Sequence, residues 1–143
     1  AVMAIIQAIC SSFKQELMEG VHDFSVEGDV FNVALYYPIA NLNSSTTTYT
    51  TAGEVVGTGY TAGGATLTSL GVTTSGTAAY FNFSAVSWSA STIAAAGALI
   101  YNTSKSNKAV AVLSFGGTFY SRNSTFTVTF PPNTSQTALI IAQ

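Results

Sequence analysis

Apolar side chains recur at steps of three and four near the start of the chain. The stripe consists of Ile5, Ile6, Ile9, Cys10, Phe13 and Leu17. This spacing places the side chains on one face of an α-helix. Charged residues such as Lys14 and Glu19 fall on the other faces, and Gly20 supplies a helix stop. The pattern predicts one amphipathic helix over residues 4–20.

A period of two replaces the helical period after Asp23. Apolar Phe31, Val33 and Leu35 alternate with the residues between them, and Pro38 follows. This alternation predicts a β-strand that begins near Val30 and ends at the proline.

Gly, Ser, Asn and Pro separate further short segments with strand character. These segments are Glu54–Tyr60, Ala65–Val72, Thr77–Phe83, Ala98–Asn102, Ala109–Phe115, Thr125–Phe130 and Ala138–Ile141. Two of them, beginning at Ala98 and Ala109, are apolar on consecutive residues, as a strand covered on both faces would be. The predicted fold is therefore all-β, an antiparallel sandwich or barrel with one N-terminal helix.

The segment from Asn41 to Thr51 is rich in Ser and Thr and too long for a tight hairpin. We expect an exposed loop there that folds on contact with a partner. No linker or internal repeat divides the chain, so residues 1–143 form a single predicted domain with its β body over residues 30–143.

The composition favours an ordered assembly subunit. Apolar types make up 48% of the residues and charged types 7%, so Ser and Thr supply most of the polarity. Disorder requires the opposite balance. Hydroxyl groups cost less to desolvate than ions do, so such a surface suits packing against other protein.

Charge is unevenly distributed. Five of the six acidic residues lie between Glu16 and Asp29, and the bases after Lys14 are Lys105, Lys108 and Arg122. Scattered bases do not form the stripe that phosphate binding needs, so we expect no direct nucleic-acid contact. The longest apolar window, Ile93 to Tyr101, is too short for a membrane helix, and no membrane partner is expected.

Candidate chemistry is sparse. Cys10 is the one cysteine, which excludes an intrachain disulfide and favours a small buried residue. From Val55 onward the sequence has no Asp, Glu or His for acid–base catalysis. His22 and Asp23 could form a metal or general-base site, but a polar helix terminus explains His22 as well. We predict no catalytic residue, no metal, no cofactor and no small-molecule substrate.

Aromatic residues offer two alternatives. Trp88 and seven tyrosines could stack on sugars or fill a packed interface. Packing is the interpretation that we favour.

Several stretches resemble small virion proteins of tailed bacteriophages, specifically capsid cement or decoration proteins. They are residues 11–24, Val33-Ala34-Leu35-Tyr36, residues 54–64, Gly97-Ala98-Leu99-Ile100-Tyr101-Asn102, and Ala109-Val110-Ala111-Val112-Leu113 with Phe115-Gly116. The chain differs from that family at Ala96 and Ser114, where the resemblance implies charged residues.

The resemblance implies a jelly-roll-like β-sandwich that binds the outside of an icosahedral capsid across capsomer boundaries. It implies the major capsid protein and further copies of the chain, as dimer or trimer, as partners, with synthesis in the bacterial host cytoplasm. For the docking surface we predict the helix stripe and the acidic run, namely Ile5, Ile6, Ile9, Phe13, Leu17, Glu16, Glu19, Asp23, Glu27 and Asp29. The alternatives are a tail, neck or host-adhesion component and a carbohydrate-binding module.

Overall fold

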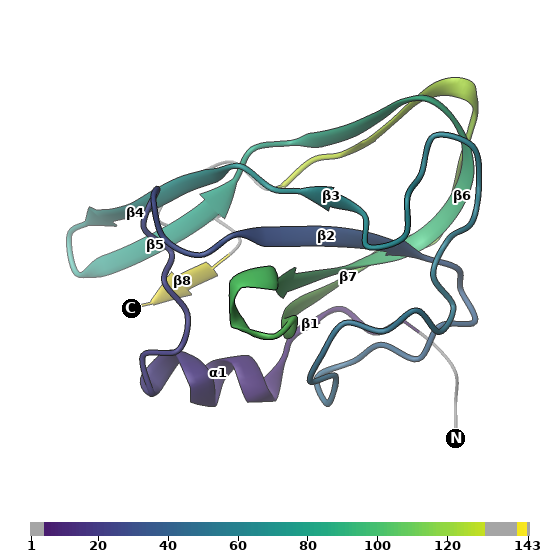
Figure 1. Ribbon diagram of the computed structural model, residues 1–143. Helices are drawn as coiled ribbons and strands as arrows, with labels where there is room; N and C mark the ends of the chain where they lie inside the picture. Colours follow the sequence, from purple (N-terminus) through teal and green to yellow (C-terminus); the bar gives the residue numbers. More distant parts are fainter. Residues whose placement is uncertain (1–4, 131–139, 143) are drawn as a thin grey trace.

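The computed structural model describes residues 5–130 and 140–142, and its elements form a layered β body with one helix beneath it (Figure 1). Strands account for 52% of the chain. The paired strands run antiparallel throughout this part of the chain. The helix is α1 (Ser11–Met18). These features confirm the predicted all-β antiparallel fold with a single helix.

Two sheets make up the body. The larger has the strand order β1 (Ala8–Ile9), β7 (Lys108–Val128), β6 (Val86–Asn102), β2 (Phe31–Tyr36) and β3 (Ala65–Thr66). The smaller has the order β4 (Ser69–Ser75), β5 (Ala78–Phe83) and β8 (Ile140–Ala142). The strand order of the described residues does not confirm the jelly-roll part of the prediction.

The long hairpin β6–β7 dominates the fold. The hairpin includes three segments that we predicted as separate short strands. The Gly, Ser and Asn residues at which we expected the strands to end lie within continuous strands that contain bulges. The register steps from Gly97 opposite Ser114 to Ala95 opposite Phe119, so residues 115–118 loop out of the ladder. Bulges increase the local bend and twist of a ribbon. The hairpin accordingly curls upward and back over β2 and β3 (Figure 1). Its turn contains the 3₁₀-helix η1 (Thr103–Lys105).

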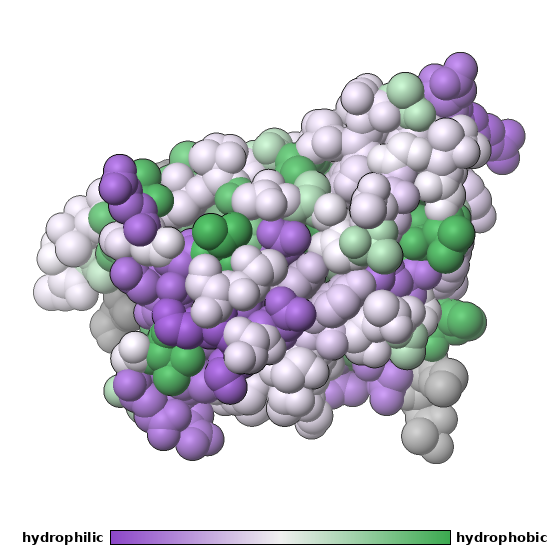
Figure 2. All heavy atoms as spheres, viewed as in Figure 1, coloured by the Kyte–Doolittle hydropathy of each residue, from purple (hydrophilic) through white to green (hydrophobic). Residues whose placement is uncertain are grey.

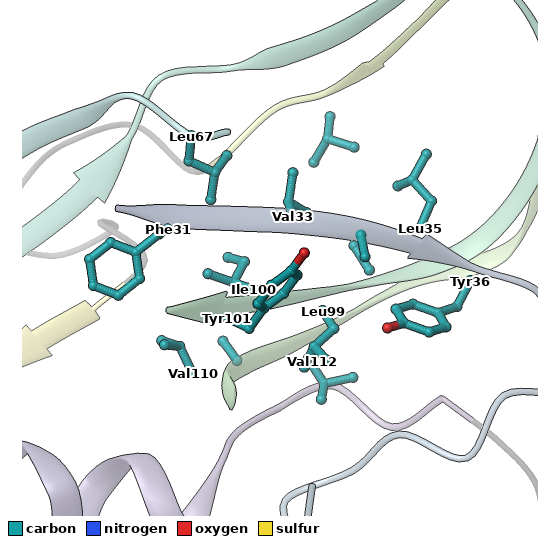
Figure 3. Packing of buried hydrophobic residues seen from close by; sticks show 14 of the residues in the cluster. Phe31, Val33, Leu35, Tyr36, Leu67, Leu99, Ile100, Tyr101, Val110 and Val112 are labelled. Atoms are coloured by element: carbon teal, nitrogen blue, oxygen red, sulfur yellow. The ribbon is translucent and has the colours of Figure 1, made fainter. Parts of the chain in front are cut away.

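β2 lies in the larger sheet between β6 and β3 and confirms the strand predicted from the alternation. Its side chains from Val33 to Tyr36 are completely buried, on both faces of the sheet. Figure 3 shows Val33 and Leu35 of β2 in the packed interior, together with Leu99 and Ile100 of β6 and Val110 and Val112 of β7. Each large apolar side chain buried in this way contributes about 1.5–3 kcal/mol.

Other strand predictions had mixed outcomes. β5 confirms the strand predicted over Thr77–Phe83, whereas Ala65–Val72 is divided between β3 and the start of β4. The prediction for Glu54–Tyr60 was wrong, because this segment makes only isolated bridges from Glu54 and Thr58. A Cβ at Gly57 would lie 2.5 Å from the carbonyl oxygen of Thr92, which shows how closely the loop packs. Residues 138 and 139 of the last predicted strand lie outside the described residues.

The helix begins later than predicted. Residues 5–10 are extended: the amide of Ile6 donates to the carbonyl of Leu42, and Ala8 and Ile9 pair with Val112 and Ala111. β-branched isoleucines favour the extended conformation, and here they complete the edge of a sheet. The prediction of a helix over residues 4–20 was therefore wrong before Ser11.

The predicted stop at Gly20 is confirmed. Gly20 has φ of 74°, its amide donates to the Leu17 carbonyl, and the Val21 amide donates to the Glu16 carbonyl. This is a Schellman motif, in which a left-handed glycine closes the helix.

The loop from Asn41 to Thr51 is exposed at most of its positions, as expected, but it is anchored to the body of the isolated chain. Leu42 is completely buried. The Tyr36 hydroxyl donates to the Thr50 carbonyl at 2.6 Å, and Thr48 bridges to Lys108. The apolar Leu42 and the neighbouring backbone therefore anchor this polar sequence.

Candidate functional site

A groove lies along the second half of β7. It has a volume of about 420 Å³. Four aromatic side chains, three threonines and one valine line it: Phe115, Phe119, Tyr120, Phe126, Thr125, Thr127, Thr129 and Val128. The curl of the β6–β7 hairpin and the excursion at residues 115–118 bring these side chains together. The groove is thus a product of the bulged hairpin.

Two of its aromatic rings are unusually exposed. Phe119 is 56% and Tyr120 is 65% accessible to solvent. None of the lining side chains is charged, and the guanidinium of Arg122 lies 6.0 Å from the centre of the Tyr120 ring. Exposed aromatic residues beside an arginine are typical of the energetically important positions in protein interfaces.

Aromatic contacts connect the groove to the core. The Phe115 ring lies 6.4 Å from Phe119 and 6.3 Å from Phe126, and Phe126 lies 6.3 Å from Trp88. Trp88 in turn lies 5.9 Å from Tyr60. Trp88 is only 6% exposed, so it cannot stack on a sugar from solvent. The aromatic surface that is free to bind a partner is the pair Phe119 and Tyr120.

A buried carboxylate lies at the inner end of this aromatic series. Glu54 accepts hydrogen bonds from the hydroxyls of Tyr49 and Tyr60, both at 2.5 Å, and from the Gly63 amide at 2.8 Å. The Tyr60 hydroxyl also accepts a hydrogen bond of 2.9 Å from the Leu35 amide. Glu54, through Tyr60, therefore ties the loop at residues 49–63 to strand β2.

The tyrosines around Glu54 are held in their neutral form. Burial raises the pKa of Tyr60 and of Tyr49, and the hydrogen bond that each donates to Glu54 raises it further. Burial also raises the pKa of Tyr36 and Tyr101. A neutral phenol is the donor that a carboxylate requires. We interpret this network as structural, because its polar atoms are all satisfied by one another.

A second buried network joins the helix to the β6–β7 turn. The His22 side chain is fully buried, with Nε2 3.0 Å from Glu16 Oε1 and Nδ1 2.9 Å from Asn102 Nδ2. The Asn102 amide also donates to Asp29 Oδ2 at 2.7 Å. Lys105 donates to Asp29 Oδ1 at 2.7 Å. His22 is thus a buried connecting residue, not an exposed helix terminus.

The predicted apolar docking stripe is not a single surface. Phe13 is completely buried against His22 and Phe24, and Ile5 and Ile9 pack against the core. Ile6 and Leu17 are exposed, but Ile6 belongs to the extended segment and Leu17 to α1. Phe13, Ile5 and Ile9 therefore serve the interior of the fold. The stripe does not form one surface, because the isoleucines do not belong to the helix.

The acidic run is divided in the same way. Glu16 pairs with His22 and lies 3.6 Å from Lys108, and Asp29 pairs with Lys105. Burial on its own would raise the pKa of Asp29, but hydrogen bonds from Lys105, Asn102 and the Asp23 amide lower it below its usual value. Glu19, Asp23 and Glu27 are the exposed members. They remain the part of the run that is free to contact a basic surface.

Cys10 is buried, as predicted for a small apolar residue. Burial raises the pKa of its thiol to about 11, and the nearby carboxylate of Glu16 adds to the effect. Across residues 5–130 and 140–142, no group of three or more His, Cys, Asp or Glu side chains is arranged to hold a metal ion. None of the described helices is long and apolar enough to cross a membrane.

Sequence reasoning missed the groove and the Glu54 network. Phe119 and Tyr120 follow Gly116 and Gly117, which we interpreted as the end of a strand. One sequence feature could have indicated the role of Glu54: it is a single carboxylate near several tyrosines in an apolar, Gly-rich segment. A lone charge in such surroundings is usually paired when it is buried.

The comparisons with known proteins gave no match: no family model, no curated protein and no solved structure is significantly similar to this chain.

Proposed function

We propose that the protein is a structural subunit of a tailed-phage virion, a cement or decoration protein that binds the outside of the capsid and stabilises it. The observation that carries the proposal is the pair of exposed aromatic rings, Phe119 and Tyr120, in an uncharged groove. A globular chain gains by covering such side chains, and assembly with other protein covers them.

The distribution of charge supports the same role. Glu16, Asp29, Lys105 and Lys108 are engaged with one another or with His22, and Glu54 is buried among tyrosines. Large apolar side chains are exposed over several elements, and Figure 2 shows weakly polar and apolar patches across much of the visible face. Few ions would need to be desolvated when this surface is buried.

Binding of this kind would stabilise a shell by mass action. A subunit that binds the assembled capsid and not its dissociated parts shifts the equilibrium towards assembly. The resemblance to cement proteins, described above from the sequence, points in the same direction. The capsid partner would be the major capsid protein at boundaries between capsomers.

The test is to image virions that contain the protein by electron cryomicroscopy and to compare them with particles from a deletion strain. We expect density on the outer shell between capsomers, and a lower temperature of genome release from the deletion particles. Adding the purified protein back should restore the wild-type temperature. Density confined to the tail, or equal heat stability of the two particles, would contradict the proposal.

A second candidate is host adhesion through carbohydrate. The groove places three threonine hydroxyls beside Phe119 and Tyr120, and aromatic faces and hydroxyls are the groups that bind neutral sugars. Glycan binding by the isolated protein that is lost in Tyr120→Ala would favour adhesion. Absence of binding across a broad glycan array would remove this candidate.

A further inference from the structure

Strand β4 forms an open edge of the smaller sheet. It pairs with β5 in a regular register from Val72 opposite Phe81 to Ser75 opposite Ala78. Its other side has no strand neighbour within residues 5–130 and 140–142. An edge strand presents a row of outward backbone N–H and C=O groups that can pair with another chain.

The end of the β4–β5 hairpin is also uncovered on its faces. Every residue from 72 to 75 is exposed, although successive side chains point to opposite faces. The hairpin projects from one end of the body in Figure 1, and in Figure 2 that end carries mostly pale, weakly polar side chains. β8 pairs with the far side of β5, so β4 keeps an open outer edge that an additional strand would cover.

The features that normally protect an edge are missing here. Natural edges carry charges, prolines, bulges or a covering segment. The sequence between Glu54 and Lys105 has no charged residue and no proline. The one bulge of β4 is at Gly71, whose φ is 77°, and it precedes the regular part of the strand. Within the described part of the chain, residues 72–75 therefore offer an edge without a strand neighbour.

We propose that β4 pairs antiparallel with β4 of a second copy of this chain across a two-fold axis. The strand is suited to pairing with itself because it is uncharged, so no like charges meet at the axis. With the axis at Thr74, the two copies of Thr74 lie directly opposite each other on the same face of the sheet, and cross-strand threonine pairs are favourable. The two small sheets then form one continuous sheet. This inference does not depend on the proposed capsid role, because self-association can be measured on the isolated protein without capsids.

Charge placed on the edge tests the pairing. In analytical ultracentrifugation of the full chain we expect a reversible dimer, and we expect Thr74→Lys and Thr74→Glu each to raise its dissociation constant at least about tenfold, because like charges then lie opposite each other. Mixing the two variants should restore dimers, since opposite charges meet. Ser89→Lys is the matched control, since Ser89 is an exposed residue of β6, and it should leave the dissociation constant unchanged.

Hydrogen exchange of the unmodified protein gives a second readout that does not depend on a variant folding. Amides of residues 72–75 that point outward should exchange more slowly at high protein concentration than at low concentration. A chain that stays monomeric at all concentrations overturns the proposal. So does a dimer that neither Thr74 variant weakens. Protection of β4 that is seen only on capsids would assign the edge to a strand of another protein instead.

Discussion

The side-chain amide nitrogen of Asn102 lies 2.9 Å from Nδ1 of His22, although 80 residues separate the two in the sequence. The orientation of the amide is fixed by its other bonds: Oδ1 accepts from the Ser104 amide, and Nδ2 also donates to Asp29. An NH₂ group can only donate, so Nδ1 of His22 accepts, and Nε2 carries the hydrogen that faces Glu16. One buried side chain thus sets the tautomer of another.

Replacing Asn102 should remove this network. We expect Asn102→Ala to lower the free energy of unfolding by about 3 kcal/mol, because the change leaves His22 Nδ1 and the Ser104 amide without partners. Urea denaturation measures the loss. Asn41→Ala, at an exposed loop position, is the control and should change stability by less than about 0.5 kcal/mol. Equal effects of the two substitutions would show that the network contributes nothing.

The buried carboxylate of Glu54 should be more tolerant of an amide than of an apolar side chain. Glu54→Gln keeps one oxygen for the Gly63 amide and the Tyr60 hydroxyl, and the Tyr49 hydroxyl can rotate to accept from the new NH₂ group. We expect a loss of about 1 kcal/mol for Glu54→Gln and about 3 kcal/mol for Glu54→Leu. Thermal unfolding of the two variants side by side makes the comparison. A Leu variant as stable as the Gln variant would contradict the assigned role.

Stability should fall in alkali. The pKa values of Tyr49 and Tyr60 are raised in the folded state above the ordinary value of 10.0, so the unfolded chain loses these protons first. Their contribution to stability is complete below pH 10 and decreases as the pH rises above it. Urea denaturation at pH 8, 10 and 11 should show this decrease. In Tyr60→Phe the slope should be smaller, and an unchanged slope would exclude Tyr60 as its source.

Gly64 should accept no side chain. A Cβ there would lie 1.8 Å from the carbonyl oxygen of Val33, and φ is 81°. We expect Gly64→Ala to lower the free energy of unfolding by about 3 kcal/mol or more, since it displaces the buried strand β2. Gly117→Ala is the matched control, because a Cβ at Gly117 meets no atom within 4 Å. Similar denaturation midpoints for both variants would show that the close approach is unimportant.

The groove aromatics should matter for assembly and not for folding. Because their rings are more than half exposed, we expect Phe119→Ala and Tyr120→Ala to change stability by less than about 1 kcal/mol. Each should weaken binding to capsids at least about tenfold. Quantitative co-sedimentation with capsids from the deletion strain measures binding. Val56→Ala, at an exposed apolar residue outside the groove, is the control.

The sequence predicted those elements in which local pattern and long-range packing agree. β2 and β5 alternate or end at clear breaks, and both were found close to the predicted positions. The length of β6 and β7 was not predictable in this way, because Gly97, Ser114 and Gly116 look like chain breaks. Instead, Gly97 pairs with Ser114 beside a bulge, and Gly116 lies within that bulge of a continuous ribbon. A bulge depends on the partner strand, which the local pattern does not contain.

The site was harder to predict than the fold. Ile5 and Ile9 match a helical period, but β pairing with distant residues decides their conformation. Asp29 and Glu16 looked like an exposed acidic run, and only the three-dimensional approach of Lys105 and Lys108 shows that they are engaged. Phe119 and Tyr120 carry no sequence signal that separates an exposed aromatic from a buried one.

The charge-free stretch that covers β3, β4, β5 and β6 also determines what trypsin can release. Cleavage after basic residues leaves one peptide from Gln15 to Lys105, well over half of the chain. Such a fragment is too large and too apolar for routine peptide mass spectrometry, so a tryptic survey of purified particles would leave most of this sequence uncovered. Chymotrypsin, which cuts after the abundant Phe and Tyr residues, would recover it.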